Sequence, residues 1–502
     1  MDQPHPARRL GQAVRWTLRA SCTLDIRSLA AFRICLGLIL IADCLLHSRD
    51  LTLMFAPDGI FPPDVLRAFH DDSAKWSLLF LDDSVRWGGM VVAAEGVAGV
   101  LLAAGCFTRV ASVMGWVVVV SMIRRTTPAT HSGDLWLVCL LFWSMFLPLG
   151  AVWSIDAQRP GTRAGSTPPS AACSIATLAL VLQLVAVYLG AGLAKCNATW
   201  FSGEAMSHAL SIHDHGSPLG MMLTDVSWIV RPLTWTVLFV ELAAPLVLIA
   251  CPAPAVRTML VATFLVFHAA IWMTMSVGLF APIGMVAWLP LMPAGVWQSF
   301  GIVPRTTGVA GLCRMATCAC GCAVALAATS FLHYWGMFGG ASLPRPVAAA
   351  IAACCLEQQW SMFGAVPSQE QWVYGRATLA DGSIVDLLRS GQPLERERPV
   401  GGFGSLGSNR WHKFFWVLPQ PGVRVFGEPT AAALARDWNA RHEPSKQVAS
   451  LELRFAAQQV TADAPIQEML LAAWPPRNHV GEGNLERLLE TVAVQQDSPP
   501  QP

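Results

Sequence analysis

A lysine at the end of a long apolar segment is well placed for chemistry. The apolar stretch 175–193 ends just before Lys195, and Trp200 follows at the depth where indole rings favour a membrane–water interface. Small residues in the last turn, including Gly192, allow a second helix or a ligand to approach closely. Removing an ammonium group from water lowers its pKa, and this is how a lysine becomes a base. The alternative is a snorkelling lysine, whose ammonium lies among lipid headgroups.

Two histidines are further candidates. His131 stands at the entrance of another apolar segment, and the nearby carboxylate of Asp134 could fix one tautomer of its ring. His268 lies inside an apolar segment, where a core histidine with a satisfied hydrogen bond is the simpler interpretation.

Charged side chains also fall inside the apolar segments. Each costs roughly 2.5–3.5 kcal/mol on insertion scales, so each needs a partner or a function. The four concerned are Arg33, Asp43, Glu95 and Glu241. We expect Arg33 to pair with a carboxylate, and such pairs to lock the helices together.

The composition is that of a membrane protein. Hydrophobic residues make up 54% of 502 and charged residues 13%, whereas soluble domains carry roughly a quarter charged residues. A net charge of +1 without a long basic run gives no indication of nucleic-acid binding. The 14 cysteines lie mostly in apolar segments, and none forms a CxxC pair that would suggest a metal site. We therefore expect no metal.

Apolar segments predict an all-α polytopic membrane bundle of about nine transmembrane helices. They cover about 28–46, 87–107, 110–124, 134–152, 174–194, 228–250, 256–276, 278–293 and 315–335. With nine spans, the two ends of the chain lie on opposite sides of the membrane, and most loop arginines lie on the same side as the N-terminus. Since arginine-rich loops stay in the cytoplasm, the N-terminus is expected in the cytoplasm and the C-terminal region outside. Arg124 and Arg125 break this rule, and we expect a specific reason for their position.

The chain divides into four predicted parts. They are a basic amphipathic N-terminal segment (1–22), a transmembrane domain (23–340), a small α+β extracytoplasmic domain (341–484) and a polar tail (485–502). Four expectations concern the α+β domain: an interfacial element at 357–363, a β-hairpin at 372–388 around Asp381-Gly382, strands at 413–418 and 451–455, and a helix near 430–441.

Taken together, several segments resemble the HTTM, or vitamin K-dependent γ-glutamyl carboxylase-like, family of membrane proteins. The resemblance covers roughly 23–365 and depends on the order and spacing of four segments. These are LAAFRICLGL (29–38), THSGDLWLVCLLFWSMFLPLGAVWSIDA (130–157), YLGAGLAKCNATWFSGEAM (188–206) and FHAAIWMTMSVGLFAPIGMVAWLPL (267–291).

The resemblance implies an enzyme of lyase type. Lys195 corresponds to the base that deprotonates reduced vitamin K or a related quinol, and His131 and His268 correspond to residues that assist. Dioxygen and carbon dioxide would be co-substrates, no metal would be needed, and a glutamate of a secreted peptide or protein would be carboxylated. The predicted substrate or cofactor pocket also includes Tyr188, Gly192, Trp200 and Arg124.

Two other functions stay open: a non-carboxylating membrane factor for the maturation or export of a secreted peptide, and a purely structural or transport role. The enzyme predicts that Lys195, His131 and His268 converge in an outward-facing apolar pocket. A structural role predicts that Lys195 faces lipid headgroups or is salt-bridged to Glu241. Membrane lipids are expected partners in every case.

Overall fold

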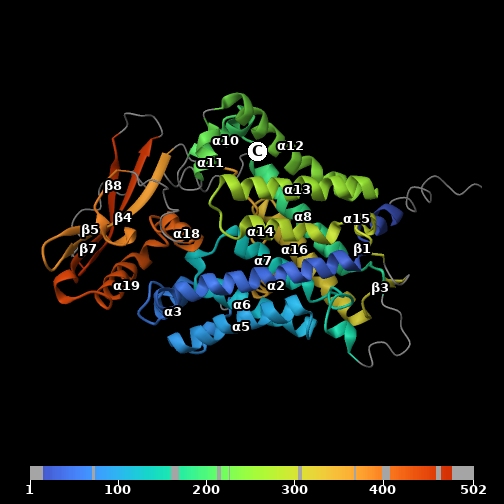
Figure 1. Ribbon diagram of the computed structural model, residues 1–502, viewed down its shortest axis with the longest axis horizontal. Helices are drawn as coiled ribbons and strands as arrows, with labels where there is room; N and C mark the ends of the chain where they lie inside the picture. Colours follow the sequence, from blue (N-terminus) through green and yellow to red (C-terminus); the bar gives the residue numbers. More distant parts are fainter. Residues whose placement is uncertain are drawn as a thin grey trace, which may run out of the picture.

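The computed structural model describes residues 15–70, 74–159, 169–211, 216–224, 226–303, 308–366, 369–397, 408–459 and 465–476. A helical bundle makes up most of the molecule, and a β-sheet domain covers one of its ends (Figure 1). We call this end of the bundle the domain-facing end. The predicted N-terminal segment lies mostly outside the described residues, and the predicted polar tail lies wholly outside them.

Among the described residues, six helices are long and apolar enough to cross a membrane, which makes this a multi-pass membrane protein. They are α2 (Ile26–Arg49), α5 (Val85–Ala104), α8 (Ile175–Ala194), α12 (Ser227–Ala250), α13 (Pro254–Thr274) and α16 (Arg314–Tyr334).

The prediction of nine such helices is not confirmed. The other three predicted spans do form helices: α6 (Thr108–Arg125), α7 (Ser132–Ser144) and α14 (Phe280–Trp288). However, α6 carries three arginines in 18 residues, and α7 and α14 have only 13 and nine residues. At about 1.5 Å per residue, α7 and α14 are too short to cross the hydrocarbon layer.

Helices α2 and α5 approach each other closely because glycines face each other across their contact. A Cβ atom on Gly37 would lie 2.6 Å from the carbonyl oxygen of Gly99, so neither position has room for a side chain. Small residues of this kind let membrane helices pack backbone to backbone. The contact holds Glu95, one turn from Gly99, against the part of α2 that carries Asp43 and His47.

Short elements complete the bundle. The short helices are α3 (Leu51–Phe55), α4 (Pro63–Phe69), α9 (Ala198–Phe201), α10 (Ala205–Ser211), α11 (Pro218–Thr224), α15 (Ala294–Ser299) and α17 (Arg345–Cys354). A sheet of three two-residue strands, in the order β1 (Leu24–Asp25), β2 (Ala171–Ala172), β3 (Val309–Ala310), ties three loops together at the end opposite the β-sheet domain (Figure 1).

The segment 356–364, which we call the covering segment, packs against the bundle with alternate side chains buried. Trp360 is fully buried, and its indole N–H donates to the side-chain oxygen of Gln358 at 2.7 Å. The amide nitrogen of Gln183 on α8 donates to the same oxygen at 2.8 Å. Gln359 and Ser361 between and after these buried residues are exposed, so the expected position of 357–363 at the membrane surface stays a prediction.

The β-sheet domain contains an antiparallel sheet in the order β6-β5-β4-β7-β8. Its strands are β4 (Gln369–Leu379), β5 (Ile384–Asp386), β6 (Gln392–Pro393), β7 (Val448–Gln459) and β8 (Gln467–Trp474), and its helices are α18 (Asn409–Val417) and α19 (Gly427–Asn439). The hairpin around Asp381-Gly382 is confirmed, with Gly382 at φ +84°. The strand at 451–455 and the helix near 430–441 are confirmed as β7 and α19.

The strand predicted at 413–418 is wrong, because residues 413–417 belong to α18 and Leu418 caps its C-terminus. Its buried aromatic residues, Trp411, Phe414 and Phe415, follow the spacing of one helix face. Phe414 packs edge-on against Phe61 of the bundle, with ring centroids 5.2 Å apart. Because one hydrophobic core continues across this contact, the sheet domain is seated on the bundle.

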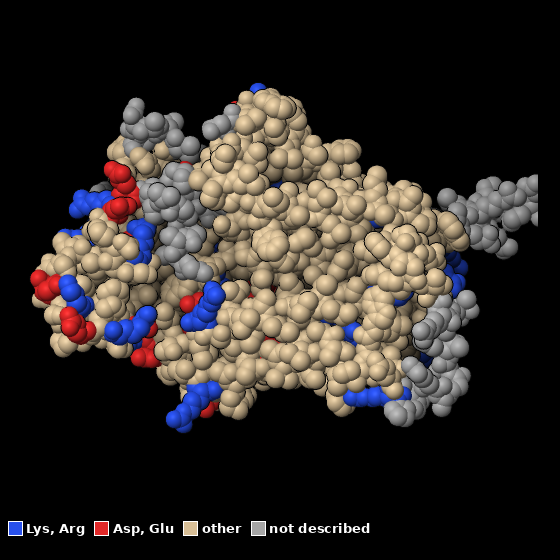
Figure 2. Space-filling model, viewed as in Figure 1, with Lys and Arg blue, Asp and Glu red and all other residues tan. Residues whose placement is uncertain are grey.

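In Figure 2 the charged side chains gather on the sheet domain, whereas the bundle's visible flank is mostly uncharged.

Candidate functional site

Lys195 is buried in an ion pair. It ends α8, and its Nζ lies 2.8 Å from the Oε2 of Glu241 on α12. The two helices come this close because Gly192 leaves room: a Cβ atom there would lie 2.9 Å from the side chain of Leu242. Lys195 is 3% exposed, so it does not snorkel to the headgroups. Of the expected arrangements, the salt bridge to Glu241 is the one that is present.

The covering segment closes over this pair. The Nζ of Lys195 donates to the carbonyl oxygen of Met362 at 2.7 Å. The indole of Trp200 donates to the carbonyl oxygen of Phe363 at 3.0 Å, and its ring lies 5.3 Å from the Nζ of Lys195. A cation over an indole face is favourable. The amine also donates to the carbonyl oxygen of Ala191 at 3.4 Å, so the lysine is held by one carboxylate, two carbonyls and one aromatic ring.

His268, on α13, lies in an aromatic enclosure. Its Nε2 is 2.7 Å from the hydroxyl of Tyr188 on α8, and the indole of Trp288 donates to the same hydroxyl at 2.8 Å. The tautomer of His268 sets which of the two groups donates in this hydrogen bond. The Nδ1 of the ring has no hydrogen-bond partner among the described residues. Gly284 on α14 faces the ring, and a Cβ atom there would lie 2.3 Å from it.

His131 caps the N-terminus of α7. Its Nδ1 accepts from the backbone N–H of Gly133 at 3.1 Å, and Asp134 accepts from the backbone N–H of His131 at 3.0 Å. The ring proton is therefore on Nε2, which lies 3.5 Å from the Oδ1 of Asp134. Burial lowers the pKa of His131, so the ring is neutral near pH 7. The tautomer predicted from Asp134 is thus supported by the geometry.

The three predicted catalytic residues occupy three separate surroundings. Within the part of the chain that the structure describes, no hydrogen bond or ion pair joins Lys195, His131 and His268. Phe280 lies between the two histidines: it packs on the ring of His268 and next to Gly133, beside His131. His131 lines a cavity of about 340 Å³ at the domain-facing end, and neither Lys195 nor His268 is among the residues that line it.

This cavity has a charged wall that comes from both parts of the molecule. Arg410 of α18 lies 2.8 Å from Asp43 on α2 and 3.3 Å from Asp134 on α7. All three side chains are buried. The carboxylates hold the pKa of Arg410 above its ordinary value despite burial, so the guanidinium is charged. Asp43 thus has a partner that is 367 residues away in the sequence.

The comparisons decide the family. The family model described as the HTTM domain matches residues 22–297, more than half of the chain. The chain belongs to the HTTM family. No curated protein and no solved structure gives a significant match. HTTM domains are found in membrane proteins of the vitamin K-dependent carboxylase type.

The matched HTTM segment contains Asp43, His131 and Asp134, whereas Arg410 lies beyond it. The sheet domain therefore supplies the cation for two acids of the HTTM segment. Sequence reasoning missed Arg410, and the only available signal was the isolated Asp43, which needed a partner somewhere. It also missed His47, whose Nδ1 lies 3.1 Å from the Oε2 of Glu95.

Two predicted residues of this HTTM protein lie elsewhere. Arg33 does not pair with a carboxylate; its guanidinium donates to the carbonyl of Trp153, and its Nε and Nη1 have no hydrogen-bond partner among the described residues. Arg124 lies 3.0 Å from Glu357 of the covering segment and donates to the carbonyl of Ala352. This ion pair accounts for the position of Arg124, which did not follow the rule of positively charged cytoplasmic loops. Arg124 does not line the cavity of His131.

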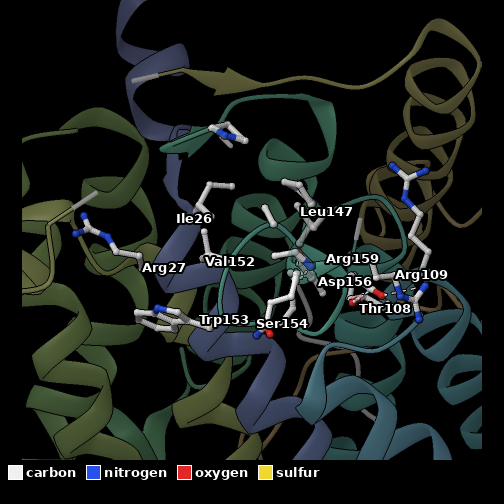
Figure 3. A pocket seen from close by; sticks show the side chains of 18 of the residues that line it. Ile26, Arg27, Thr108, Arg109, Leu147, Val152, Trp153, Ser154, Asp156 and Arg159 are labelled. Carbon is white, nitrogen blue, oxygen red and sulfur yellow. Dashed lines mark hydrogen bonds and ion pairs between the residues drawn. The ribbon is translucent and has the colours of Figure 1, made fainter. Parts of the chain in front are cut away.

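A second and larger cavity, of about 1040 Å³, opens at the opposite end of the bundle. Figure 3 shows Thr108, Arg109, Asp156 and Arg159 on one side of it and Arg27 on the other. Two of its arginines are paired, Arg27 with Asp25 at 2.7 Å and Arg159 with Asp156 at 3.5 Å. The predicted site residues do not line it.

Proposed function

We propose that this HTTM protein is a quinol-dependent membrane enzyme of the γ-glutamyl carboxylase type, with Lys195 as the base that deprotonates the quinol. The observation that carries the proposal is that the amine of Lys195 is buried beside the ring of Trp200, with Glu241 at 2.8 Å to take its proton; the salt bridge by itself is also what a structural role predicts. Two buried charges are costly, and replacing them with apolar residues is often neutral or stabilising. A function is a reason to keep them.

The surroundings of Lys195 fit a quinol. Its amine is next to the ring of Trp200 and the covering segment, and Leu242, Phe267 and Phe363 belong to the same apolar cluster as Trp200. Apolar walls suit a prenylated ring, and the amine and the carbonyl of Met362 suit its hydroxyl group. When bound, the quinol supplies the reducing equivalents that the reaction with dioxygen needs.

Glu241 has a defined role in this proposal. Transfer of one proton across the 2.8 Å between Lys195 and Glu241 turns the ion pair into a neutral amine and a neutral acid. The neutral amine then accepts a hydroxyl proton, and the acid keeps the proton that the lysine gave up. A desolvated site favours this neutral form over the charged pair. His268 and His131 would assist from their separate positions.

The proposed orientation follows from the arginines. Arg27, Arg109 and Arg159 line the larger cavity at the end of the bundle opposite the sheet domain. At the same end, Arg257 donates to carbonyl oxygens just before β1, and Arg314 begins α16 just after β3. Since positively charged loops stay in the cytoplasm, we place that end in the cytoplasm and the sheet domain outside. The outer cavity beside His131 is then reachable by a secreted peptide.

The test is carbon dioxide fixation by the protein in lipid nanodiscs. Wild type and Lys195→Ala receive reduced vitamin K, dioxygen, labelled bicarbonate and a glutamate-containing peptide. Lys446→Ala is the matched control, because this lysine is exposed on the sheet domain. Label in the peptide with wild type and Lys446→Ala, and none with Lys195→Ala, is the expected result. If quinol oxidation depends on Lys195 but the peptide carries no label, the quinol site is supported and the carboxylase activity is refuted.

A second candidate is a non-carboxylating factor for the maturation or export of a secreted peptide. The closed state of Lys195 favours it, because the amine is enclosed by Glu241 and Met362 while the cavity of His131 is separate and open. A peptide would then bind at that cavity, and Lys195 would only hold α8 to α12. Neither quinol oxidation nor peptide label in wild type, together with peptide binding that is lost in His131→Phe, would favour this candidate.

A further inference from the structure

We propose that Asp43, His47 and Glu95 form a binding site for one divalent transition-metal ion between α2 and α5, next to the outer cavity. The site would fix the two helices to each other at the domain-facing end of the bundle. It is independent of the proposed quinol chemistry, since none of its residues contacts Lys195 or Glu241.

The geometry is that of a ligand set. One nitrogen of His47 and one oxygen from each carboxylate all lie within 4.8 Å of one another. The Nδ1 of His47 is 3.1 Å from the Oε2 of Glu95 and 3.8 Å from the Oδ2 of Asp43. A metal ion held at about 2.1 Å from each donor atom places the donors roughly 3–4 Å apart. The close contact of Gly37 with Gly99 supplies this arrangement.

The carboxylates have unused oxygens. The Oδ2 of Asp43 and the Oε1 of Glu95 are buried and accept from no donor group among the described residues, and the two carboxyl groups lie within hydrogen-bonding reach of each other. Asp43 and Glu95 are 2% and 0% exposed. A buried oxygen without a donor is costly, whether the carboxylate is charged or neutral. A cation held between Asp43 and Glu95 would compensate both carboxylates.

The carboxylates around this site outnumber the cations that pair with them. Three carboxylates, those of Asp43, Glu95 and Asp134, share one guanidinium, that of Arg410. Lys413, the other cation on α18, lies over the ring of Trp416 at 4.4 Å instead. A metal ion binds ionised carboxylates and a neutral imidazole, and in that state these groups carry two uncompensated negative charges, which one divalent ion cancels.

The donor set also indicates the class of ion. One imidazole nitrogen with two carboxylates suits Zn²⁺, Mn²⁺, Fe²⁺ or Co²⁺, whereas Mg²⁺ and Ca²⁺ take oxygen donors alone. Asp43 is among the residues that line the outer cavity, which gives an ion a route to the site. Arg410 binds the Oδ1 of Asp43 and leaves Oδ2 for the ion.

Cobalt titration of the chelator-treated full chain in nanodiscs tests this site. Wild type is expected to bind one equivalent of Co²⁺ with visible absorption bands, and Zn²⁺ is expected to displace it. Glu95→Gln and His47→Gln preserve side-chain length and are expected to weaken binding at least tenfold. Asp134→Asn is the matched control, because this carboxylate contacts Arg410 but is outside the ligand set.

A second readout covers the variants that fold poorly. Added Zn²⁺ should raise the thermal unfolding midpoint of wild type and Asp134→Asn in a concentration-dependent way, and should leave Glu95→Gln unchanged. The proposal is overturned if wild type binds no stoichiometric Co²⁺, because protons would then neutralise the cluster. It is also overturned if both ligand variants bind Co²⁺ as tightly as wild type does.

Discussion

The Nζ of Lys195 and the Oε2 of Glu241 lie 2.8 Å apart between two membrane helices, with side chains only 3% and 6% exposed. Removing one partner of such a pair leaves an uncompensated buried charge, whereas removing both does not. Comparing the stability of single and double variants therefore shows how much each charge of the pair contributes by compensating the other.

Lys195→Met or Glu241→Leu alone is expected to destabilise the protein by about 3–5 kcal/mol. The double variant should recover most of this loss, because two apolar side chains can fill the space between α8 and α12. Thermal unfolding in nanodiscs measures both effects. If the double variant is as unstable as the sum of the single variants, Lys195 and Glu241 do not compensate each other.

Gly284→Ala is expected to destabilise the bundle by about 1–3 kcal/mol, because an added Cβ would lie 2.3 Å from the ring of His268. It should also disturb the hydrogen bond between His268 and Tyr188. Gly295→Ala is the control, since a Cβ there meets nothing within 4 Å. Unfolding midpoints of the two variants provide the comparison, and equal midpoints would contradict the close contact.

Arg410→Gln is expected to loosen the sheet domain from the bundle and to cost about 3–5 kcal/mol, since Asp43 and Asp134 would lose their common cation. Limited proteolysis should then cut between the two parts faster than in wild type. Arg441→Gln changes an arginine whose side chain is 65% exposed and should have no such effect. Equal cleavage rates in both variants would show that the hydrophobic core alone seats the domain.

Burial lowers the pKa of Lys413 from 10.5 to about 8. Between these values the unfolded chain binds more protons than the folded protein, so stability should rise as the pH increases from about 8 to about 10.5. Lys413→Met should remove this rise and add roughly 2 kcal/mol at pH 7, where the charged amine is desolvated. Unfolding midpoints measured across this window test it, and parallel curves for wild type and variant would refute it.

Much of the fold was predictable because the signals are local. Apolar runs marked every long helix of the bundle, and Asp381-Gly382 marked the hairpin between β4 and β5. Run length did not settle whether α6, α7 and α14 cross the membrane, since an apolar segment can also fill a helical core. The segment 413–418 misled, because its apolar residues fit a strand as well as one face of α18.

The candidate site was predictable only in part. Lys195, Trp200 and Gly192 do form one neighbourhood, because they are close in sequence on and beyond α8. His131 and His268 were expected to converge with them, yet each is held by its own partners. Which of two intramembrane acids pairs with a given cation is not a local property, so Arg33 was given the wrong kind of partner.

The sequence alone determined that this chain is a multi-pass membrane protein with a β-containing C-terminal region, because hydropathy and turn chemistry act over a few residues at a time. Only the tertiary structure decided which charges meet. Arg410 reaches Asp43 across 367 residues, and His47 meets Glu95 because two glycines let α2 and α5 touch. Buried charges must be compensated by whatever the fold brings near, and that depends on how the helices pack rather than on their order along the chain.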